Sequence, residues 1–360
     1  MKELAELPKR CPVNGTFELT IRCNLHCKMC LFRHADCENA TLQQNELTTE
    51  QWISLGEQVA KAGTLSLLIT GGEPLLRKDF CEIYEGLYQQ GFLITLYTNA
   101  TLVTPEILQL FQKYPPHRIG VTLYGASAAA YEKVCGNGAA FEKAVEGIKL
   151  LQTLPSILQF RMAIIKDNYE EVEAIETLVR KEFSSDAIVT QPNILIASVR
   201  GACTNVQACR LSPEENIQLL YRRVFSKAKQ IMGEYYREDA VKFKRVESEA
   251  CSVKEHYSLV GCMAGMDQYA ITWDGKLQGC QLLDAFQTDA AQEGFLNAWE
   301  RFPYAVNMPP LNDTCQNCNL IHDCQCCPAS RLAETGDLGG LPEYACTQTK
   351  ILKEREPEDE

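Results

Sequence analysis

Three cysteines, Cys23, Cys27 and Cys30, lie close together near the start of the chain. In a chain without an export signal, clustered thiols more often bind metal than form disulfides. Structural zinc sites are usually closed by four protein ligands, often as paired Cys-x2-Cys units. Three thiolates on one loop instead leave one iron of a 4Fe–4S cube without a protein ligand, and a bound amino-acid chelate needs such an open position. The spacing therefore favours an open iron–sulfur cube, with a three-thiol zinc site as the alternative.

A second group of cysteines lies in the last third of the chain. In order, its members are Cys262, Cys280, Cys315, Cys318, Cys324, Cys327 and Cys346, and Cys326 competes with Cys327. A zinc ribbon is the alternative to a cluster here as well. Other cysteines are expected to be small buried hydrophobic residues, and this set is Cys11, Cys37, Cys81, Cys135, Cys203 and Cys209. Cys203 and Cys209 are also candidates for contact with a substrate.

Composition narrows the class of protein. The chain has 360 residues, a formal net charge of −12 and 46% hydrophobic residues. That charge argues against nucleic-acid binding, which calls for clustered basic surface. The polar start does not resemble a signal peptide, and no apolar run is long enough to span a membrane. We therefore expect a cytoplasmic protein without nucleic-acid or membrane partners.

Apolar strands alternate with amphipathic helices over the first half of the chain. We expect strands at residues 16–22, 65–70, 93–97, 119–123, 159–165 and 187–190. The expected helices start at Thr48, with a capping box to Gln51, at Asp79, at Pro105, at Phe141 and at Tyr169. Six such units predict an α/β fold, a partial parallel β/α barrel with its chemistry at the carboxyl ends of the strands. A small cysteine-rich α+β domain follows.

The expected domains follow from these changes in composition. Residues 1–12 are an N-terminal segment, 13–205 the partial barrel, 206–250 a helical bridge, 251–350 the cysteine-rich domain and 351–360 an acidic tail. A hairpin with an Asp274-Gly275 turn is expected within the cysteine-rich domain.

The chain resembles the radical S-adenosylmethionine (SAM) superfamily through the Cys-x3-Cys-x2-Cys motif at 23–30 and through Gly71-Gly72-Glu73-Pro74 after the second strand. The resemblance implies a 4Fe–4S cluster whose open iron binds the methionine moiety of S-adenosyl-L-methionine. It also implies that the glycines permit close backbone approach, and that Glu73 lies near the substrate ammonium. Further residues implied to contact the cofactor are Met29, Asn99, Thr122 and Arg161.

The second cysteine group resembles the SPASM extension of the same superfamily, which holds two auxiliary 4Fe–4S clusters. By this resemblance, the outer cluster is held by Cys315, Cys318, Cys324 and Cys346, and the inner one by Cys262, Cys280 and Cys327. The fourth inner ligand is Cys251 or His256, or the position is open.

The resemblance implies an enzyme that forms a 5′-deoxyadenosyl radical and removes hydrogen from a peptide or protein, most often to mature a ribosomal peptide. Expected partners are the peptide and a one-electron reductant such as flavodoxin or ferredoxin. Because only a short segment precedes the first strand, leader-peptide recognition lies in the bridge or in a separate protein, or is absent. The alternatives are an anaerobic sulfatase-maturating enzyme, which has Asp where this chain has Gln281, and a non-enzymatic electron carrier.

Overall fold

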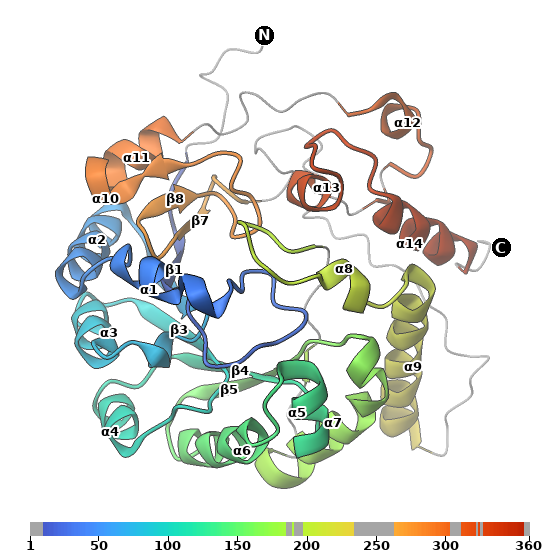
Figure 1. Cartoon of the computed structure of the whole chain (residues 1–360), viewed down its shortest axis with the longest axis horizontal. Coiled ribbons are helices and arrows are strands. Elements are labelled where there is room, and N and C mark those ends of the chain that lie inside the picture. Colours follow the sequence, from blue (N-terminus) through green and yellow to red (C-terminus); the bar gives the residue numbers. More distant parts are fainter. Residues whose placement is uncertain are drawn as a thin grey trace. The chain divides into compact units, whose positions relative to one another are not determined.

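The computed structural model describes residues 10–184, 189–190, 197–233, 263–302, 311–321, 323–324 and 327–355. The chain divides into two compact units (Figure 1). Met1–Arg210 and Tyr257–Asn307 form the first, and Leu211–His256 and Met308–Glu360 form the second. The first unit thus includes the segment with the Asp274-Gly275 turn, whereas the domain boundaries predicted above stay predictions.

A nine-stranded sheet, in the order β6-β5-β4-β3-β2-β1-β7-β8-β9, organises the first unit. The strands are β1 (Asn14–Thr20), β2 (Ser66–Gly71), β3 (Leu93–Thr98), β4 (Arg118–Leu123), β5 (Ile157–Met162), β6 (Val189–Thr190), β7 (Gln268–Ile271), β8 (Lys276–Gln278) and β9 (Thr288–Asp289). Neighbours from β1 to β6 pair in parallel. This confirms the predicted α/β fold with a parallel sheet.

The sheet continues beyond β1 in a way that the sequence did not indicate. β7 pairs in parallel with β1, with Phe17 opposite Ile271. The Asp274-Gly275 turn joins β7 to β8, and this pair is antiparallel as predicted. The residues after β7 therefore lie at the same edge of the sheet as the residues after β1, because carboxyl ends of parallel strands share an edge.

Helices cover the outer side of this sheet, and Figure 1 shows α2, α3 and α4 following one another along it, with α5, α6 and α7 grouped beyond them. The helices of the first unit are α1 (Asn39–Gln44), α2 (Thr49–Ala62), α3 (Phe80–Tyr88), α4 (Pro105–Lys113), α5 (Ala128–Cys135), α6 (Ala140–Leu151), α7 (Val172–Leu178), α8 (Val206–Cys209), α10 (Ala290–Glu293) and α11 (Phe295–Arg301). Phe17 of β1 packs on Trp52 of α2, with ring centroids 5.0 Å apart. Side chains alternate along a strand, so the neighbours of Phe17 face the inner side.

Several local predictions are confirmed and others are wrong. The capping box forms, since Gln51 N donates to Thr48 Oγ1 (3.3 Å) and Thr48 N to Gln51 Oε1 (2.8 Å). Asp79 precedes α3, but its side chain makes no capping bond. The helix expected from Tyr169 is α7 between a 3-10 and a π turn. Helix α5 was not predicted, because its alanine-rich sequence has little amphipathic pattern.

The second unit contains α9 (Pro213–Met232), α12 (Asp313–Gln316), α13 (Pro328–Thr335) and α14 (Glu343–Glu354). Ser212 caps α9 by accepting from Glu215 N (3.1 Å). Tyr344 of α14 donates its hydroxyl to Leu211 O (2.9 Å), which ties α14 to the start of α9. Across the described residues, every helix is too short or too polar to cross a membrane.

Candidate active site

The loop with Cys23, Cys27 and Cys30 follows β1 and is anchored to α5. His26 N donates to Cys135 O and Lys28 N to Val134 O, both at 3.0 Å. Cys27 lies in a buried apolar cluster whose members include Leu25, Met29, Tyr131, Val134 and Cys135. The unpredicted helix therefore fixes the cysteine loop.

Burial controls the chemistry of the three thiols. Burial raises the pKa of Cys30 to about 11. Burial and the nearby Glu73 carboxylate raise the pKa of Cys23 further. A hydrogen bond to Cys135 and burial raise the pKa of Cys27. Metal-free thiols here are protonated at neutral pH, so iron must displace their protons on binding.

The donor types suit an iron–sulfur cube, because the three soft sulfur ligands of one loop lie within or against one apolar cluster. Cys27 and Cys30 each raise the pKa of Cys23, and Cys27 also raises the pKa of Cys30. In the described part of the chain, no three Cys, His, Asp or Glu side chains form a site for a metal ion. The role of these cysteines as ligands therefore stays a prediction.

The glycines at the end of β2 are required by the backbone at the end of β1 and just after it. Gly71 has φ +138°, and a Cβ there would lie 2.1 Å from Thr20 O. A Cβ on Gly72 would lie 2.3 Å from Arg22 O. Gly72 N donates to Thr20 O (2.8 Å), and Glu73 N donates to Arg22 O (2.9 Å). The backbone that approaches these glycines closely is thus that of the residues just before Cys23. Pro74 is buried and begins the 3-10 turn that follows.

Glu73 is fully buried and holds the end of β3. Its Oε1 accepts from Leu75 N (3.1 Å) and Thr98 Oγ1 (2.8 Å), and its Oε2 accepts from Asn99 N (2.7 Å). Burial raises the pKa of this carboxyl to about 7, although the three hydrogen bonds oppose the rise. In this structure its contacts are with the chain itself, and contact with a substrate ammonium stays a prediction.

The predicted residues Thr122 of β4 and Arg161 of β5 lie on the inner face of the sheet, together with Tyr97 of β3. Thr122 is paired with Arg161 in the register. The Arg161 guanidinium lies over the Tyr97 ring, 4.3 Å from its centroid. Gly120 makes room for this contact, because a Cβ there would lie 2.6 Å from the Tyr97 ring. These side chains form one polar and aromatic wall at the carboxyl ends of the strands.

Two predicted cofactor residues, Asn99 and Met29, lie outside this wall and contact the cysteine loop or the apolar cluster around it. Asn99 donates its amide to Cys23 Sγ (3.9 Å) and Asn24 Oδ1 (2.9 Å), which links β3 to the cysteine loop. Met29 is 4% exposed within the apolar cluster around Cys27. Its side chain is therefore covered by protein, and its contact with the adenine stays a prediction.

Comparison with known proteins decides the family. Residues 17–179 match the radical SAM superfamily. This segment of the chain is a radical SAM domain. Over 333 residues it is 27% identical to an AdoMet-dependent heme synthase of Methanosarcina barkeri, covering 89% of this chain and 92% of that protein. Over 166 residues it is 31% identical to an Fe-coproporphyrin III synthase of the same organism, covering 46% and 40%.

Solved structures with this fold cover nearly the whole chain. Streptococcus suis SuiB bound to S-adenosylmethionine has a TM-score of 0.68 at 16% identity, covering 94% of this chain and 77% of SuiB. The protein anSMEcpe with bound AdoMet and the Cp18Cys peptide has a TM-score of 0.67 at 14% identity, covering 95% and 96%. This protein is a radical SAM enzyme, so a 4Fe–4S cluster and SAM are implied, and the electron-carrier alternative is wrong.

Four of the predicted auxiliary ligands of this radical SAM enzyme gather in the second unit. Burial raises the pKa of Cys346, and the neighbouring Cys324, Cys315 and Cys318 raise it further. Asn312 donates to Cys315 Sγ (3.3 Å). Three thiols of the predicted outer cluster thus act electrostatically on the fourth, while the cluster itself stays a prediction.

The predicted inner ligands are less completely described. Cys280 follows β8 and accepts from Leu282 N (3.4 Å). Cys327 precedes α13, where its sulfur accepts from Ser330 N (3.4 Å). Cys251, His256, Cys262 and Cys326 lie outside the described residues.

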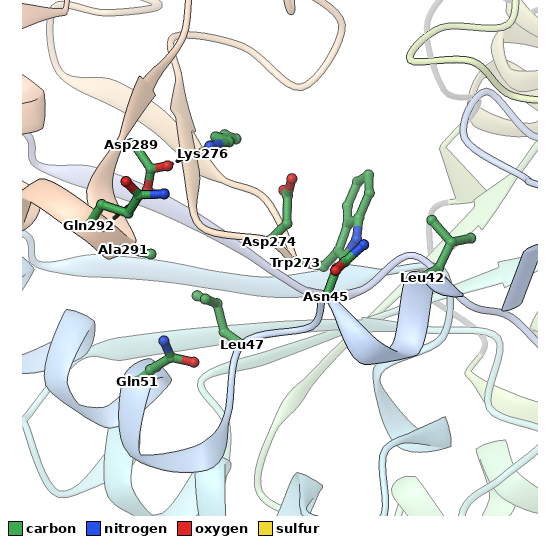
Figure 2. A pocket seen from close by; sticks show the side chains of 10 residues that line it. All are labelled: Leu42, Asn45, Leu47, Gln51, Trp273, Asp274, Lys276, Asp289, Ala291 and Gln292. Atoms are coloured by element: carbon green, nitrogen blue, oxygen red, sulfur yellow. Dashed lines mark hydrogen bonds and ion pairs between the residues drawn. The ribbon is translucent and has the colours of Figure 1, made fainter. Parts of the chain in front are cut away.

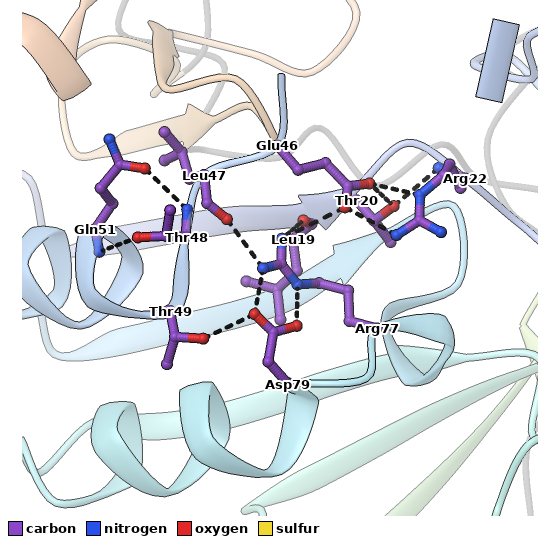
Figure 3. A network of polar contacts seen from close by, with 10 residues as sticks. All are labelled: Leu19, Thr20, Arg22, Glu46, Leu47, Thr48, Thr49, Gln51, Arg77 and Asp79. Atoms are coloured by element: carbon purple, nitrogen blue, oxygen red, sulfur yellow. Dashed lines mark hydrogen bonds and ion pairs between the residues drawn. The ribbon is translucent and has the colours of Figure 1, made fainter. Parts of the chain in front are cut away.

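A network of charged side chains, shown in Figure 3, fixes the segment before α2 against the end of β1. Arg22 donates to both carboxylate oxygens of Glu46, each at 2.9 Å. Arg77 donates to Leu19 O (2.8 Å) and Leu47 O (2.9 Å). Arg77 also lowers the pKa of Asp79, against the opposing effect of partial burial. Because Arg22 directly precedes Cys23, the network holds one end of the cysteine loop.

A cavity of about 390 Å³ lies beside the β7–β8 turn (Figure 2). Its lining includes Asn45, Leu47, Trp273, Asp274 and Lys276. None of the site residues predicted from the sequence lines it. The wall of β3 to β5 and the cysteine loop, rather than this cavity, form the candidate active site.

Sequence reasoning missed Glu18, Arg200, Tyr124 and the role of Cys135. The Tyr124 hydroxyl donates to the Cys27 sulfur. Glu18 is 1% exposed inside the half-barrel, where it binds Arg200 and Gln281. A carboxylate in the middle of an otherwise apolar strand was the available signal for Glu18. Arg200 had no signal, because its partner lies 182 positions away in the sequence.

Proposed function

We propose that this radical SAM enzyme modifies a peptide or protein, most simply in the maturation of a ribosomal peptide. The charges at the carboxyl ends of the strands carry this proposal. Three cations there already bind carboxylates of the chain, namely Arg22 to Glu46 (2.9 Å), Lys28 to Asp167 (2.7 Å) and Arg200 to Glu18 (2.6 Å).

A substrate with several carboxylates needs unpaired cations, because burying an unpaired charge is costly. A peptide can bind through uncharged amide groups and needs none. Among the described cations of this edge, Arg161 and Lys166 have no carboxylate partner: Arg161 lies over Tyr97, and Lys166 donates to Ala208 O (3.4 Å). We assign Arg161 with Thr122 to SAM, so Lys166 would remain for a substrate carboxylate, which suits a peptide better than a substrate with several carboxylates.

The fold supports the same proposal. It is shared with SuiB, which has been solved with the precursor peptide SuiA at a TM-score of 0.66 and 14% identity. Similarity at this identity concerns the fold alone. The support for a peptide substrate that comes from this chain itself is the pairing of the charges.

The chain's own residues would hold the cofactors and shape their surroundings. Cys23, Cys27 and Cys30 would ligate the first cluster, and the sulfur sets described above would ligate two auxiliary clusters. When bound, the reduced cluster and SAM supply a 5′-deoxyadenosyl radical that removes a hydrogen atom from carbon. Glu73 and Asn99 fix the strand ends around this site, and the apolar cluster around Cys27 excludes water from it. The electron would come from flavodoxin or ferredoxin in the cytoplasm.

A second candidate is chemistry on a heme precursor. Its support is the 27% identity to an AdoMet-dependent heme synthase over 92% of that protein. Coproporphyrins carry carboxylate side chains, so this substrate would have to displace one of the paired carboxylates or bind cations outside the described residues.

Sulfatase maturation has less support. Gln281 stands where those enzymes place Asp, and its amide donates to Glu18 Oε1 (2.7 Å). Position 281 therefore supplies a donor and no base.

One experiment separates these candidates. The anaerobically reconstituted enzyme is incubated with SAM and a reductant, together with either peptides encoded beside its gene or Fe-coproporphyrin III. Mass spectrometry follows 5′-deoxyadenosine and the substrate. A mass change in a peptide supports the proposal. Conversion of Fe-coproporphyrin III with unchanged peptides would replace it by the second candidate.

A further inference from the structure

A buried ion pair inside the half-barrel joins three distant segments. Glu18 lies on β1 beside Phe17, which packs outward on Trp52, so Glu18 faces the inner side. Arg200 donates to Glu18 through Nη1 (2.6 Å to Oε2) and Nη2 (2.9 Å to Oε1). The side chains of Arg200 and Glu18 are 5% and 2% exposed. The third segment contributes Gln281, whose Nε2 donates to Glu18 Oε1 (2.7 Å).

Two aromatic rings contact the Arg200 guanidinium of this pair. It lies 4.2 Å from the centroid of Phe32, two residues after Cys30. It lies 5.7 Å from the centroid of Trp273, in the turn after β7. Such contacts favour a cation over the ring face and restrict its orientation.

The segment around Arg200 is hydrogen-bonded directly to the cysteine loop. Val199 N donates to Leu31 O (2.9 Å), and Cys203 N donates to Arg33 O (2.8 Å). Thr204 Oγ1 donates to Cys30 O (2.6 Å). Residues 199–204, which we term the strap, thus bind the carbonyls that immediately follow the predicted cluster ligands.

Two features of the Arg200–Glu18 pair lower the stability of the folded chain, which is unexpected if the pair only stabilises the fold. Arg200 has φ 55°, a left-handed conformation that costs a non-glycine residue about 1 kcal/mol. Burying an ion pair costs desolvation energy that a well-packed apolar pair would avoid. Costs of this kind concentrate at positions that serve function.

We propose that Arg200 is a positioning residue, which holds the loop of Cys23, Cys27 and Cys30 at a fixed separation from the loop that begins at Cys280. Gln281 directly follows Cys280, so the Glu18 carboxylate connects both loops through Arg200 and Gln281. An amide suits position 281, because aspartate there would place a second negative charge against Glu18. The inference concerns SAM cleavage by a radical SAM enzyme and is independent of the substrate class.

Hydrogen exchange measured by mass spectrometry tests the grip on the loop in the anaerobically purified enzyme. Arg200→Met and Gln281→Asp should raise exchange at the amides of Val199 and Cys203 by about tenfold or more, while α2 keeps its protection. Arg180→Met is the matched control, because Arg180 is 37% exposed and lies 3.9 Å from Glu176 on the helix surface. It should leave exchange at both amides unchanged.

SAM cleavage without substrate is the second measurement. It should fall about tenfold in Arg200→Met and recover in part in Arg200→Lys, which keeps the charge but loses the two-pronged contact. Unchanged exchange at Val199 and Cys203 in both variants would overturn the inference. So would a uniform rise that includes α2, because the pair would then only stabilise the fold. Failure of every tested peptide to react would bear on the proposed function alone.

Discussion

Glu73 couples the stability of the folded chain to pH. The effect of Glu73→Gln on the free energy of unfolding should therefore change from destabilising to neutral or stabilising as the pH rises through the neutral range. Burial raises its pKa from 4.5 to about 7, which corresponds to about 3 kcal/mol at about 1.4 kcal/mol per pKa unit. The folded chain therefore keeps a proton that the unfolded chain loses above pH 4.5. This carboxyl costs almost nothing below that pH, and its cost grows until the pH passes about 7.

Glutamine removes the ionisation but loses an acceptor. The Glu73 carboxylate accepts from Leu75 N, Thr98 Oγ1 and Asn99 N. A glutamine has one acceptor oxygen, so its NH₂ group must face at least one of these donors. Leaving a buried donor unpaired costs about 1–3 kcal/mol at any pH.

At pH 5 the Glu73→Gln chain should therefore be less stable than wild type by about 1–2 kcal/mol. Between pH 5 and pH 8 the difference should move in favour of the variant by about 2–3 kcal/mol. At pH 8 the variant should match or exceed wild type.

The measurement is urea unfolding of the metal-free chain under argon at pH 5 and pH 8, with Glu57→Gln as control. Glu57 is exposed on α2, so its substitution should have the same small effect at both pH values. A Glu73→Gln effect that does not change with pH would show that burial does not perturb this carboxyl, and the reasoning would be refuted.

Three further predictions concern the cysteine loop and its supports. Gly72→Ala places a Cβ 2.3 Å from Arg22 O. It should lower the free energy of unfolding by about 1–3 kcal/mol in thermal denaturation and release iron from the first cluster. Full retention of iron would contradict this prediction. Replacing Cys23, Cys27 and Cys30 together by alanine should lower the iron content by about four per chain, from about twelve for three cubes, and abolish SAM cleavage. Residual cleavage would reject these ligands. Glu46→Gln breaks the two-pronged contact with Arg22 and should cost about 3 kcal/mol in unfolding experiments, whereas an effect below about 0.5 kcal/mol would mean that the pair is screened by solvent.

The sequence was most informative where chemistry depends on short spacing. The three thiols on one loop could be predicted because they are close together in the sequence. The glycines at the end of a strand could be predicted for the same reason. The parallel strands were predicted for the same reason, since alternation of strand and helix is a local pattern. The capping box of Thr48 and Gln51 is also local, and it was confirmed.

Tertiary structure decided what depends on contacts between distant positions. Gly72 is needed because the carbonyl of Arg22 lies against it, 50 positions earlier in the chain. The Glu18–Arg200 contact spans 182 positions, and the pairing of β7 with β1 joins Asn14 to Gln268. Helix α5, which anchors the cysteine loop, left no periodic pattern to read. Local residue patterns thus determined the predicted ligands and the strands, while side-chain packing across the half-barrel decided which charges are paired and how the cysteine loop is held.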